Sequence, residues 1–227
     1  MDYQYQGSER RETALIYYSD NAGNLPYLRD RLEVIQTLLD LGANPFYVSP
    51  EGKNALTTAW SSCQIELIGL FIAQGLKPVR TGELNLACPA KAGRADLIQF
   101  AISQGSDPNA MSGTSGIYPE KNQAPAFFNA KDVQSLRVMI SAGADLNLKD
   151  EAGRTLLMYA ADHAAWKQDS TLISALLQAG AKKKIKDPNG LTAADYYAQS
   201  RGSAKGWGSL KRWIALKHDR IYKSLKP

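Results

Sequence analysis

The sequence predicts an all-α fold: a solenoid of about six helix-turn-helix repeats with a C-terminal capping helix. Two observations carry this prediction, and the first is a recurring phrase. Segments such as LLDLGANP and MISAGADL return at intervals of 30–38 residues, and each closes on a glycine. A period of this length is typical of stacked-repeat proteins, in which each repeat buries its apolar face on its neighbours. The closing glycines are Gly42, Gly75, Gly105, Gly143 and Gly180.

The second observation is the spacing of apolar residues before each glycine, which predicts helices. Leu67, Ile68, Phe71 and Ile72 fall on one helical face. Each closing glycine then suits the position after a helix end, where the backbone is left-handed. The neighbouring repeats carry the equivalent sets Val34, Ile35, Leu38 and Leu39, and Leu97, Ile98, Ala101 and Ile102.

Six repeats fit this pattern, at residues 13–46, 52–79, 82–110, 124–148, 153–186 and 190–225. The chain therefore divides into a polar N-terminal segment (1–12), a repeat array (13–201) and a basic capping helix (202–227). Within the last segment, the stretch 209–224 is expected to be helical, because Leu210, Trp213, Ile214 and Ile221 share one face. That face is expected to close the stack by packing on Leu172, Ile173, Leu176 and Leu177.

A second set of phrases points to a family. Thr13-Ala-Leu-Ile-Tyr-Tyr and Thr155-Leu-Leu-Met-Tyr-Ala-Ala resemble the T-P-L-H-x-A-A phrase of ankyrin repeats, and the G-A-D-L-N ending at Gly143 resembles the ankyrin turn. No repeat carries the full Thr-Pro-Leu-His, so the chain is identified as a divergent member. Further glycines stand two residues before the threonine position: Gly52, Gly82, Gly153 and Gly190.

The resemblance implies a non-enzymatic protein-protein interaction module whose partner is another protein, and which is a monomer when free. Small stand-alone ankyrin proteins of this divergent kind look bacterial, and some serve as antitoxins or immunity proteins. The specific expectation is therefore an antagonist that binds and blocks a toxin or effector.

The charge distribution leaves an alternative open. The formal net charge is +5, and the segment Lys205–Lys226 carries seven basic residues against one acid, Asp219. A basic-tail adaptor would dock this segment to nucleic acid or an anionic membrane while the repeats hold a protein. The favoured interpretation is a polar cap, because the ends of a repeat stack need a polar exterior.

Cysteine content and apolar runs bear on the compartment. Cys63 and Cys88 do not make a disulfide framework, and Cys88 is expected to pack inward as a thiol, although a single bridge stays open. The longest apolar run is Leu67–Ala73, and the start of the chain has no apolar segment of signal-peptide length. We expect a cytoplasmic protein, or a periplasmic one if a leader peptide has been removed.

Candidate partner-binding residues come from departures from the period and from the family pattern. Insertions at 20–27, 109–124 and 162–169 each carry an aromatic residue, Tyr27, Tyr118 or Trp166. Tryptophan and tyrosine are enriched in interface hot spots, although each ring could instead fold over a helix end. The resemblance also implies a concave surface built from turn tips and first-helix ends. It nominates Asp20, Asn21, Lys53, Ser61, Glu83, Lys91, Arg154, Asp162 and His163.

Chemistry-bearing motifs are missing from the sequence. The two histidines, His163 and His218, stand in different repeats and match no metal-binding spacing. The stretch 202–209 lacks the Gly-Lys-Ser/Thr of a phosphate loop. Asp162 and His163 are adjacent on an expected solvated loop, which gives no reason for acid-base catalysis. We expect no cofactor, no metal and no catalytic residue. Phe127 and Phe128 cannot be placed inward or outward from the pattern.

Overall fold

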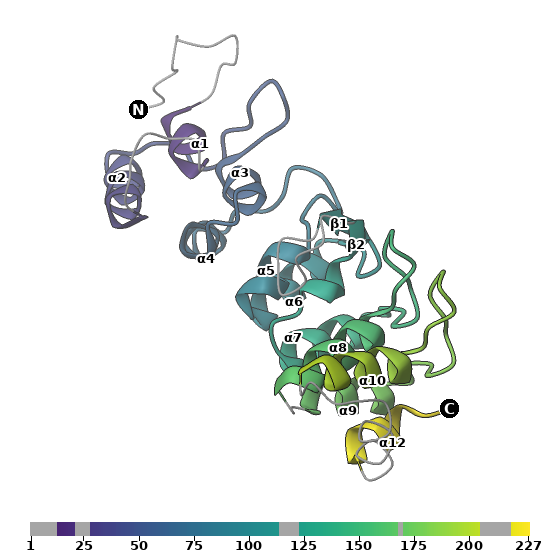
Figure 1. The fold of residues 1–227 in the computed structure, drawn as a ribbon. Helices are drawn as coiled ribbons and strands as arrows, with labels where there is room; N and C mark the ends of the chain where they lie inside the picture. Colours follow the sequence, from purple (N-terminus) through teal and green to yellow (C-terminus); the bar gives the residue numbers. More distant parts are fainter. Residues whose placement is uncertain (1–12, 21–27, 114–122, 168–169, 205–218) are drawn as a thin grey trace. The chain divides into compact units, whose positions relative to one another are not determined.

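The computed structural model describes residues 13–20, 28–113, 123–167, 170–204 and 219–227 (Figure 1). They form pairs of α-helices joined by turns, with one short two-stranded sheet, so the predicted all-α repeat fold is confirmed. The chain separates into two compact parts, an N-terminal part (Met1–Asp107) and a C-terminal part (Pro108–Pro227). Each part is described by itself.

The described residues of the N-terminal part form three helix pairs. Asn54 caps the second pair: its side chain accepts a hydrogen bond from the backbone N–H of Thr57, and the Thr57 hydroxyl accepts one from the backbone N–H of Asn54. This reciprocal pair satisfies donors that a helix start leaves open. The helices are α1 (Ala14–Ser19) with α2 (Leu28–Asp40), α3 (Ala55–Ser61) with α4 (Ile65–Ala73), and α5 (Ala87–Ala92) with α6 (Ala95–Ser103). Helix α1 also packs against α3.

The C-terminal part begins with a β-ribbon. Its strands β1 (Met111–Gly113) and β2 (Gln123–Pro125) pair antiparallel, with Met111 opposite Pro125. Helix α8 packs against α9 and extensively against α10, and α10 packs against α12. Among the described residues of this part, the helical elements are η1 (Ala126–Asn129, a 3₁₀ helix), α7 (Val133–Ser141), α8 (Leu156–Lys167), α9 (Thr171–Gln178), α10 (Ala193–Ala204) and α12 (Arg220–Leu225).

The closing glycines adopt the predicted left-handed backbone. Gly105, for example, has φ +87°, and a Cβ atom at this position would lie 2.5 Å from Cγ2 of Thr81. Glycine is therefore required there both by conformation and by the close approach of the preceding turn. The φ values at Gly42, Gly75, Gly143 and Gly180 are +84°, +82°, +95° and +93°.

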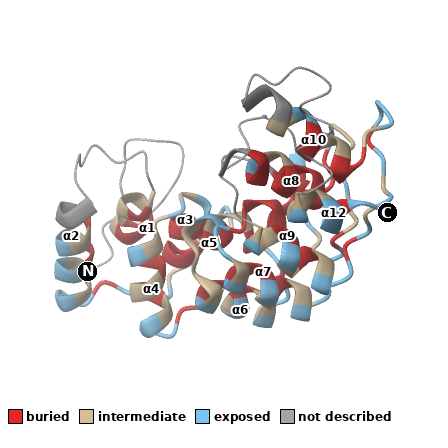
Figure 2. Cartoon of the chain, turned by 60° about the horizontal axis from the view of Figure 1, so that its bottom comes forward, coloured by how far each residue is buried: buried red, intermediate tan, exposed pale blue. Residues whose placement is uncertain are grey.

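The buried residues follow the predicted helical faces (Figure 2). Leu67, Ile68 and Phe71 of α4 are fully buried, and Ile35 is the most buried residue of its predicted set. The other members of that set, Val34, Leu38 and Leu39, are half-buried. In each part the core lies between paired helices and between neighbouring repeats, as expected for a repeat stack.

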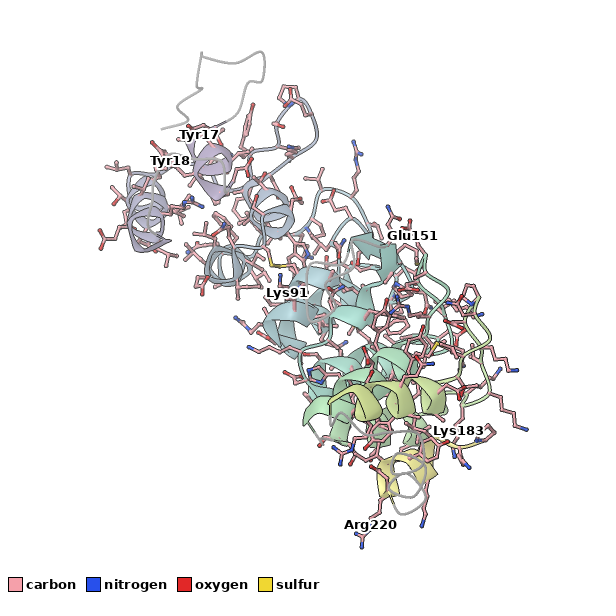
Figure 3. The ribbon with its side chains drawn as sticks, viewed as in Figure 1. Tyr17, Tyr18, Lys91, Glu151, Lys183 and Arg220 are labelled. Atoms are coloured by element: carbon pink, nitrogen blue, oxygen red, sulfur yellow. A yellow bond between two sulfur atoms is a disulfide. The ribbon has the colours of Figure 1, made fainter. Side chains whose placement is uncertain are left out.

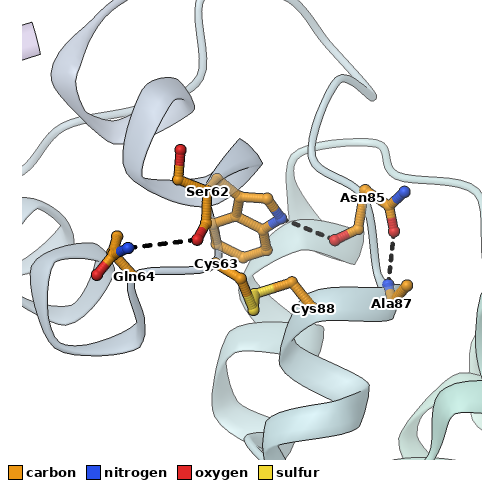
Figure 4. The surroundings of a disulfide bond; sticks show 7 residues. Ser62, Cys63, Gln64, Asn85, Ala87 and Cys88 are labelled. Atoms are coloured by element: carbon orange, nitrogen blue, oxygen red, sulfur yellow. Dashed lines mark hydrogen bonds between the residues drawn. A yellow bond between two sulfur atoms is a disulfide. The ribbon is translucent and has the colours of Figure 1, made fainter. Parts of the chain in front are cut away.

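The expected inward-packing thiol at Cys88 is wrong, because Cys63 and Cys88 form a disulfide (Figure 4). Cys63 follows α3 in the left-handed region, with φ +54°, at the position that Gly93 occupies after α5. Cys88 lies in α5 of the next repeat. Stacking of the second and third repeats brings the two Cα atoms within 5.5 Å, a distance suited to a disulfide.

The fourth repeat begins differently from the others. Where a first α-helix would stand, the chain forms β2 and then η1. Phe127 and Phe128 both point inward, with 0% and 2% of their surface exposed, which resolves their ambiguous placement. The ring of Phe128 meets that of Tyr159 edge-on, 5.9 Å between centroids. Tyr118, in the insertion between the strands, lies outside the described residues.

The solvated loop expected around Asp162 is not found, and that expectation is wrong, because α8 continues through Lys167. The additional residues of the fifth repeat lengthen this helix. Ala164 and Ala165 are then buried, at 1% and 0% exposure, in a helix that packs on α10. Small side chains allow that close approach, so the extra residues extend the core.

The end of the chain packs on α10. Asp219 caps α12, its carboxylate accepts a hydrogen bond from the Tyr197 hydroxyl at 2.8 Å, and Leu225 is fully buried. Burial and this hydrogen bond raise the pKa of Tyr197 above its ordinary value. The expected capping helix is thus described only over Arg220–Leu225, and the predicted apolar face at 210–214 lies outside the described residues.

Candidate functional site

A cleft of about 270 Å³ opens between two neighbouring turns of the N-terminal part. One turn precedes α3 in the second repeat and the other precedes α5 in the third. The cleft contains three residues nominated from the sequence: Lys53, Ser61 and Glu83. It is lined by Glu51, Gly52, Lys53, Thr57, Trp60, Ser61, Arg80, Glu83, Leu84 and Asn85.

Backbone and side-chain hydrogen bonds fix both turns. In the first, the Ser49 N–H donates to the Lys53 carbonyl at 2.7 Å, and the Lys53 N–H donates to the Ser49 hydroxyl at 3.3 Å. In the second, the Glu83 carboxylate accepts hydrogen bonds from the Val79 and Arg80 N–H groups at 2.6 and 3.1 Å. Lys53 and Arg80 are therefore presented from ordered turns while their side chains stay exposed.

The floor of the cleft is apolar and joins the two repeats. Trp60 and Leu84 are each 2% exposed. The Trp60 indole N–H donates to the Asn85 carbonyl at 2.7 Å, and the Ala87 N–H donates to the Asn85 side-chain oxygen at 2.6 Å (Figure 4). Because the Cys63–Cys88 disulfide links the same two repeats, the walls of the cleft are held by covalent and hydrogen bonds together.

Two other nominated residues of the N-terminal part lie outside the lining of this cleft. Asp20 follows α1, and its carboxylate accepts a hydrogen bond from the Ser62 hydroxyl at 2.8 Å, which joins the first repeat to the second. Lys91 is exposed on α5 (Figure 3). Asn21 and Tyr27 lie outside the described residues.

The nominated residues of the C-terminal part are partly committed to packing. The Arg154 guanidinium lies over the rings of Tyr159 and Tyr196, 5.1 and 5.6 Å from their centroids. Asp162 accepts a hydrogen bond from the Ser200 hydroxyl, whereas His163 is exposed. Trp166 lies in α8, but its side chain is outside the described part of the structure.

The aspartates near Arg154 hold the turns of the fifth and sixth repeats. The Tyr159 hydroxyl donates to Asp150 at 2.6 Å, and the Tyr196 hydroxyl donates to Asp187 at 2.8 Å. Burial acts to raise the pKa of Asp187, but its hydrogen bonds, led by the Leu191 N–H at 2.7 Å, outweigh burial and lower that pKa. These carboxylates are structural.

Arg80 and Trp60 line the cleft but were not predicted from the sequence. Arg80 stands three residues before Glu83, one position before the residues that the family pattern nominates in that turn. Trp60 replaces the small alanine that Ala90 and Ala161 supply at the equivalent helix position. A tryptophan at a position that carries a small residue in other repeats, such as Ser19, Ala90 and Ala161, is the signal that could have identified this cleft.

Over the described ranges, no group of three or more His, Cys, Asp or Glu residues is placed to hold a metal ion. None of the helices described there is both long and apolar enough to cross a membrane.

The comparisons with known proteins place the fold. No protein-family model matches the chain, and no curated protein sequence does. An ankyrin repeat domain from Acinetobacter baumannii is similar in structure, with a TM-score of 0.55 and 19% identity over 93% of this chain and 95% of that one. A chain from the complex of a Bdellovibrio bacteriovorus predatory endopeptidase with an immunity protein is also similar, with a TM-score of 0.54 and 18% identity over 86% of this chain and 96% of that one. Together with the repeat spacing and the left-handed turns, these similarities show that the chain has the ankyrin-repeat fold.

Proposed function

We propose that the chain is a non-enzymatic protein-binding module that acts as an antagonist, occupying and blocking a toxin or effector protein. The observation that carries this proposal is the cleft between the second and third repeats. Its walls are ordered by hydrogen bonds and a disulfide, while Lys53 and Arg80 stay exposed. A preorganised polar surface of this kind loses little conformational freedom when a partner binds.

The structural comparison supports the same role. One similar chain comes from a complex between an endopeptidase and an immunity protein. By analogy, the present chain would recognise one protein and act by covering it, with no reaction of its own. A bacterial source fits both similar structures.

The disulfide bears on where such an antagonist would work. Disulfides persist in oxidising compartments and are rare in the cytosol. The Cys63–Cys88 bond therefore favours the periplasmic alternative over the cytoplasmic one.

The described end of the tail favours a cap over the basic-tail adaptor. Leu225 is buried and Asp219 is bonded to Tyr197, so this end is docked on α10. Basic residues still lie near it: Arg220 is exposed, and Lys183, in the turn before α10, is half-buried (Figure 3). Electrostatic binding to polyanions weakens steeply with salt. Retention on heparin at low salt that disappears when residues 204–227 are deleted would favour the adaptor.

The antagonist proposal is tested by capture followed by inhibition. The full chain would serve as bait in extracts of the organism that encodes it, and the recovered protein would be assayed for activity with and without the chain. We expect one partner whose activity falls on stoichiometric addition, and weaker inhibition by the double variant Lys53→Glu/Arg80→Glu. The matched control Lys131→Glu/Arg137→Glu, two exposed residues of the C-terminal part, should inhibit as the native chain does. Recovery of no protein partner, together with turnover by the pure chain, would refute the proposal.

A further inference from the structure

We propose that the cleft between the second and third repeats binds a carboxylate of the partner, held by Lys53 and Arg80 above the apolar floor of Trp60 and Leu84. This inference rests on the proposed function for its biological setting, and it names the chemistry that the cleft recognises. Four features of the cleft lead to it: its cations, its acidic residues, its spare donors and its size.

The two cations of the cleft are available. Within the described residues, neither Lys53 nor Arg80 forms an ion pair. Arg80 lies over the first turn: a Cβ atom added to Gly52 would lie 3.2 Å from Nη2 of Arg80. The glycine thus lets the guanidinium approach the turn that carries Lys53. Arg94 offers a contrast, because its two hydrogen bonds to Asp96, at 2.9 and 2.6 Å, already engage it and lower the pKa of that carboxyl.

Both acidic residues of the cleft already have interactions of their own. One oxygen of Glu83 accepts hydrogen bonds from the Val79 and Arg80 N–H groups, which fixes it in its own turn. Glu51 also has an interaction of its own. Their negative charges oppose a dianion such as a phosphate monoester more than a singly charged group. A carboxylate, which a guanidinium can bind through two parallel hydrogen bonds, is the better match.

The neutral polar groups of the cleft are better placed to donate than to accept. The Asn85 side-chain oxygen accepts from the Ala87 N–H, which leaves the NH₂ of that amide as a donor. The Trp60 indole N–H is used by the Asn85 carbonyl, so the ring offers the cleft an apolar contact. The apolar area that a ligand can reach is small, because Trp60 and Leu84 are each only 2% exposed, so the charge of the bound group supplies most of the recognition.

The size of the cleft fits a residue of a partner protein. Pockets for drug-sized ligands range from about 300 to 1,000 Å³. At about 270 Å³, this cleft lies just below that range. One acidic side chain, or the C-terminal residue of a chain, is the occupant that its size and chemistry favour.

The inference is tested by NMR titration of the isotopically labelled full chain, which needs no partner. The probes for a side-chain carboxylate are the N-acetyl, N-methylamide derivatives of aspartate and glutamate, and N-acetyl-alanine presents a C-terminal carboxylate. The neutral controls are the matching asparagine and glutamine derivatives. We expect saturable shifts of the Trp60 indole N–H and the Asn85 side-chain amide with a carboxylate probe. The neutral probes should bind at least about tenfold more weakly, because a charge-assisted hydrogen bond is lost.

Two double variants sharpen the test. Lys53→Gln/Arg80→Gln should abolish the saturable shifts, whereas Lys131→Gln/Arg137→Gln, which removes the same charge elsewhere, should retain them. A response to the aspartate or glutamate probe alone would assign a side chain as the source, and a response to N-acetyl-alanine alone would assign a chain end. The proposal fails if no carboxylate probe gives a saturable shift, if the neutral probes bind equally well, or if the Lys53→Gln/Arg80→Gln variant responds unchanged. A negative titration beside a captured and inhibited partner would overturn this inference and leave the proposed function standing.

Discussion

Removing the Cys63–Cys88 disulfide should lower the free energy of unfolding of the N-terminal part by about 3.5 kcal/mol. The two cysteines are separated by 25 residues in the sequence. Closing a loop of that length in the unfolded chain removes an entropy of about 12 cal/mol/K, which corresponds to about 3.5 kcal/mol at 25 °C. The double variant Cys63→Ser/Cys88→Ser makes this change without leaving a free thiol.

Urea unfolding followed at Trp60 measures the effect, because this residue lies beside the disulfide and joins the same two repeats. For an m-value of about 2 kcal/mol/M, the midpoint should fall by about 2 M. A thiol reductant should produce a similar shift in the native chain and none in the double variant. Equal midpoints for the native chain and the variant would refute the reasoning, as would an equal effect of the reductant on both.

A second variant separates the disulfide from the backbone conformation. Cys63 has φ +54°, a value that is unfavourable for residues other than glycine. Cys63→Gly/Cys88→Ser should therefore be more stable than Cys63→Ser/Cys88→Ser by about 1 kcal/mol. If glycine gives no gain over serine, the left-handed assignment at this residue is wrong.

Three further changes should each have a measurable effect on stability. Gly105→Ala should lower the melting temperature more than Gly143→Ala. Both residues have a left-handed backbone, but only at Gly105 would the new Cβ atom meet Thr81. An unchanged melting temperature in both variants would mean that the helix caps are misassigned. Asp187→Asn should cost about 1–3 kcal/mol at pH 7. The folded-state pKa of Asp187 is lowered, so its contribution to stability is present above the unfolded pKa of about 3.9 and is lost as pH falls through the folded value. In urea unfolding at low pH, the free energies of unfolding of the native chain and of the variant should therefore converge. Leu225→Ala should cost about 2–5 kcal/mol, since the side chain is fully buried, and an unchanged melting temperature would mean that the tail is not a cap.

The sequence predicted what depends on local chemistry. Each closing glycine marks a left-handed turn because few other residues tolerate that backbone, so Gly42 and Gly143 could be placed without any knowledge of their neighbours. The apolar residues of α4 predicted a buried helical face for the same reason. Lys53 and Glu83 could be nominated because the resemblance to ankyrin repeats implies that these turn positions face a partner.

Contacts between repeats were decided by the tertiary structure. Cys63 and Cys88 carry no signal of pairing in the sequence, and only the stacking of two repeats brings their Cα atoms within 5.5 Å. The helical extension through Asp162 likewise depends on α10, against which α8 packs. The cleft itself arises from two turns 30 residues apart, with Arg80 lying over Gly52. Periodic local preferences determine which residues form helices and turns, whereas the space between neighbouring repeats is set by the side chains that meet there.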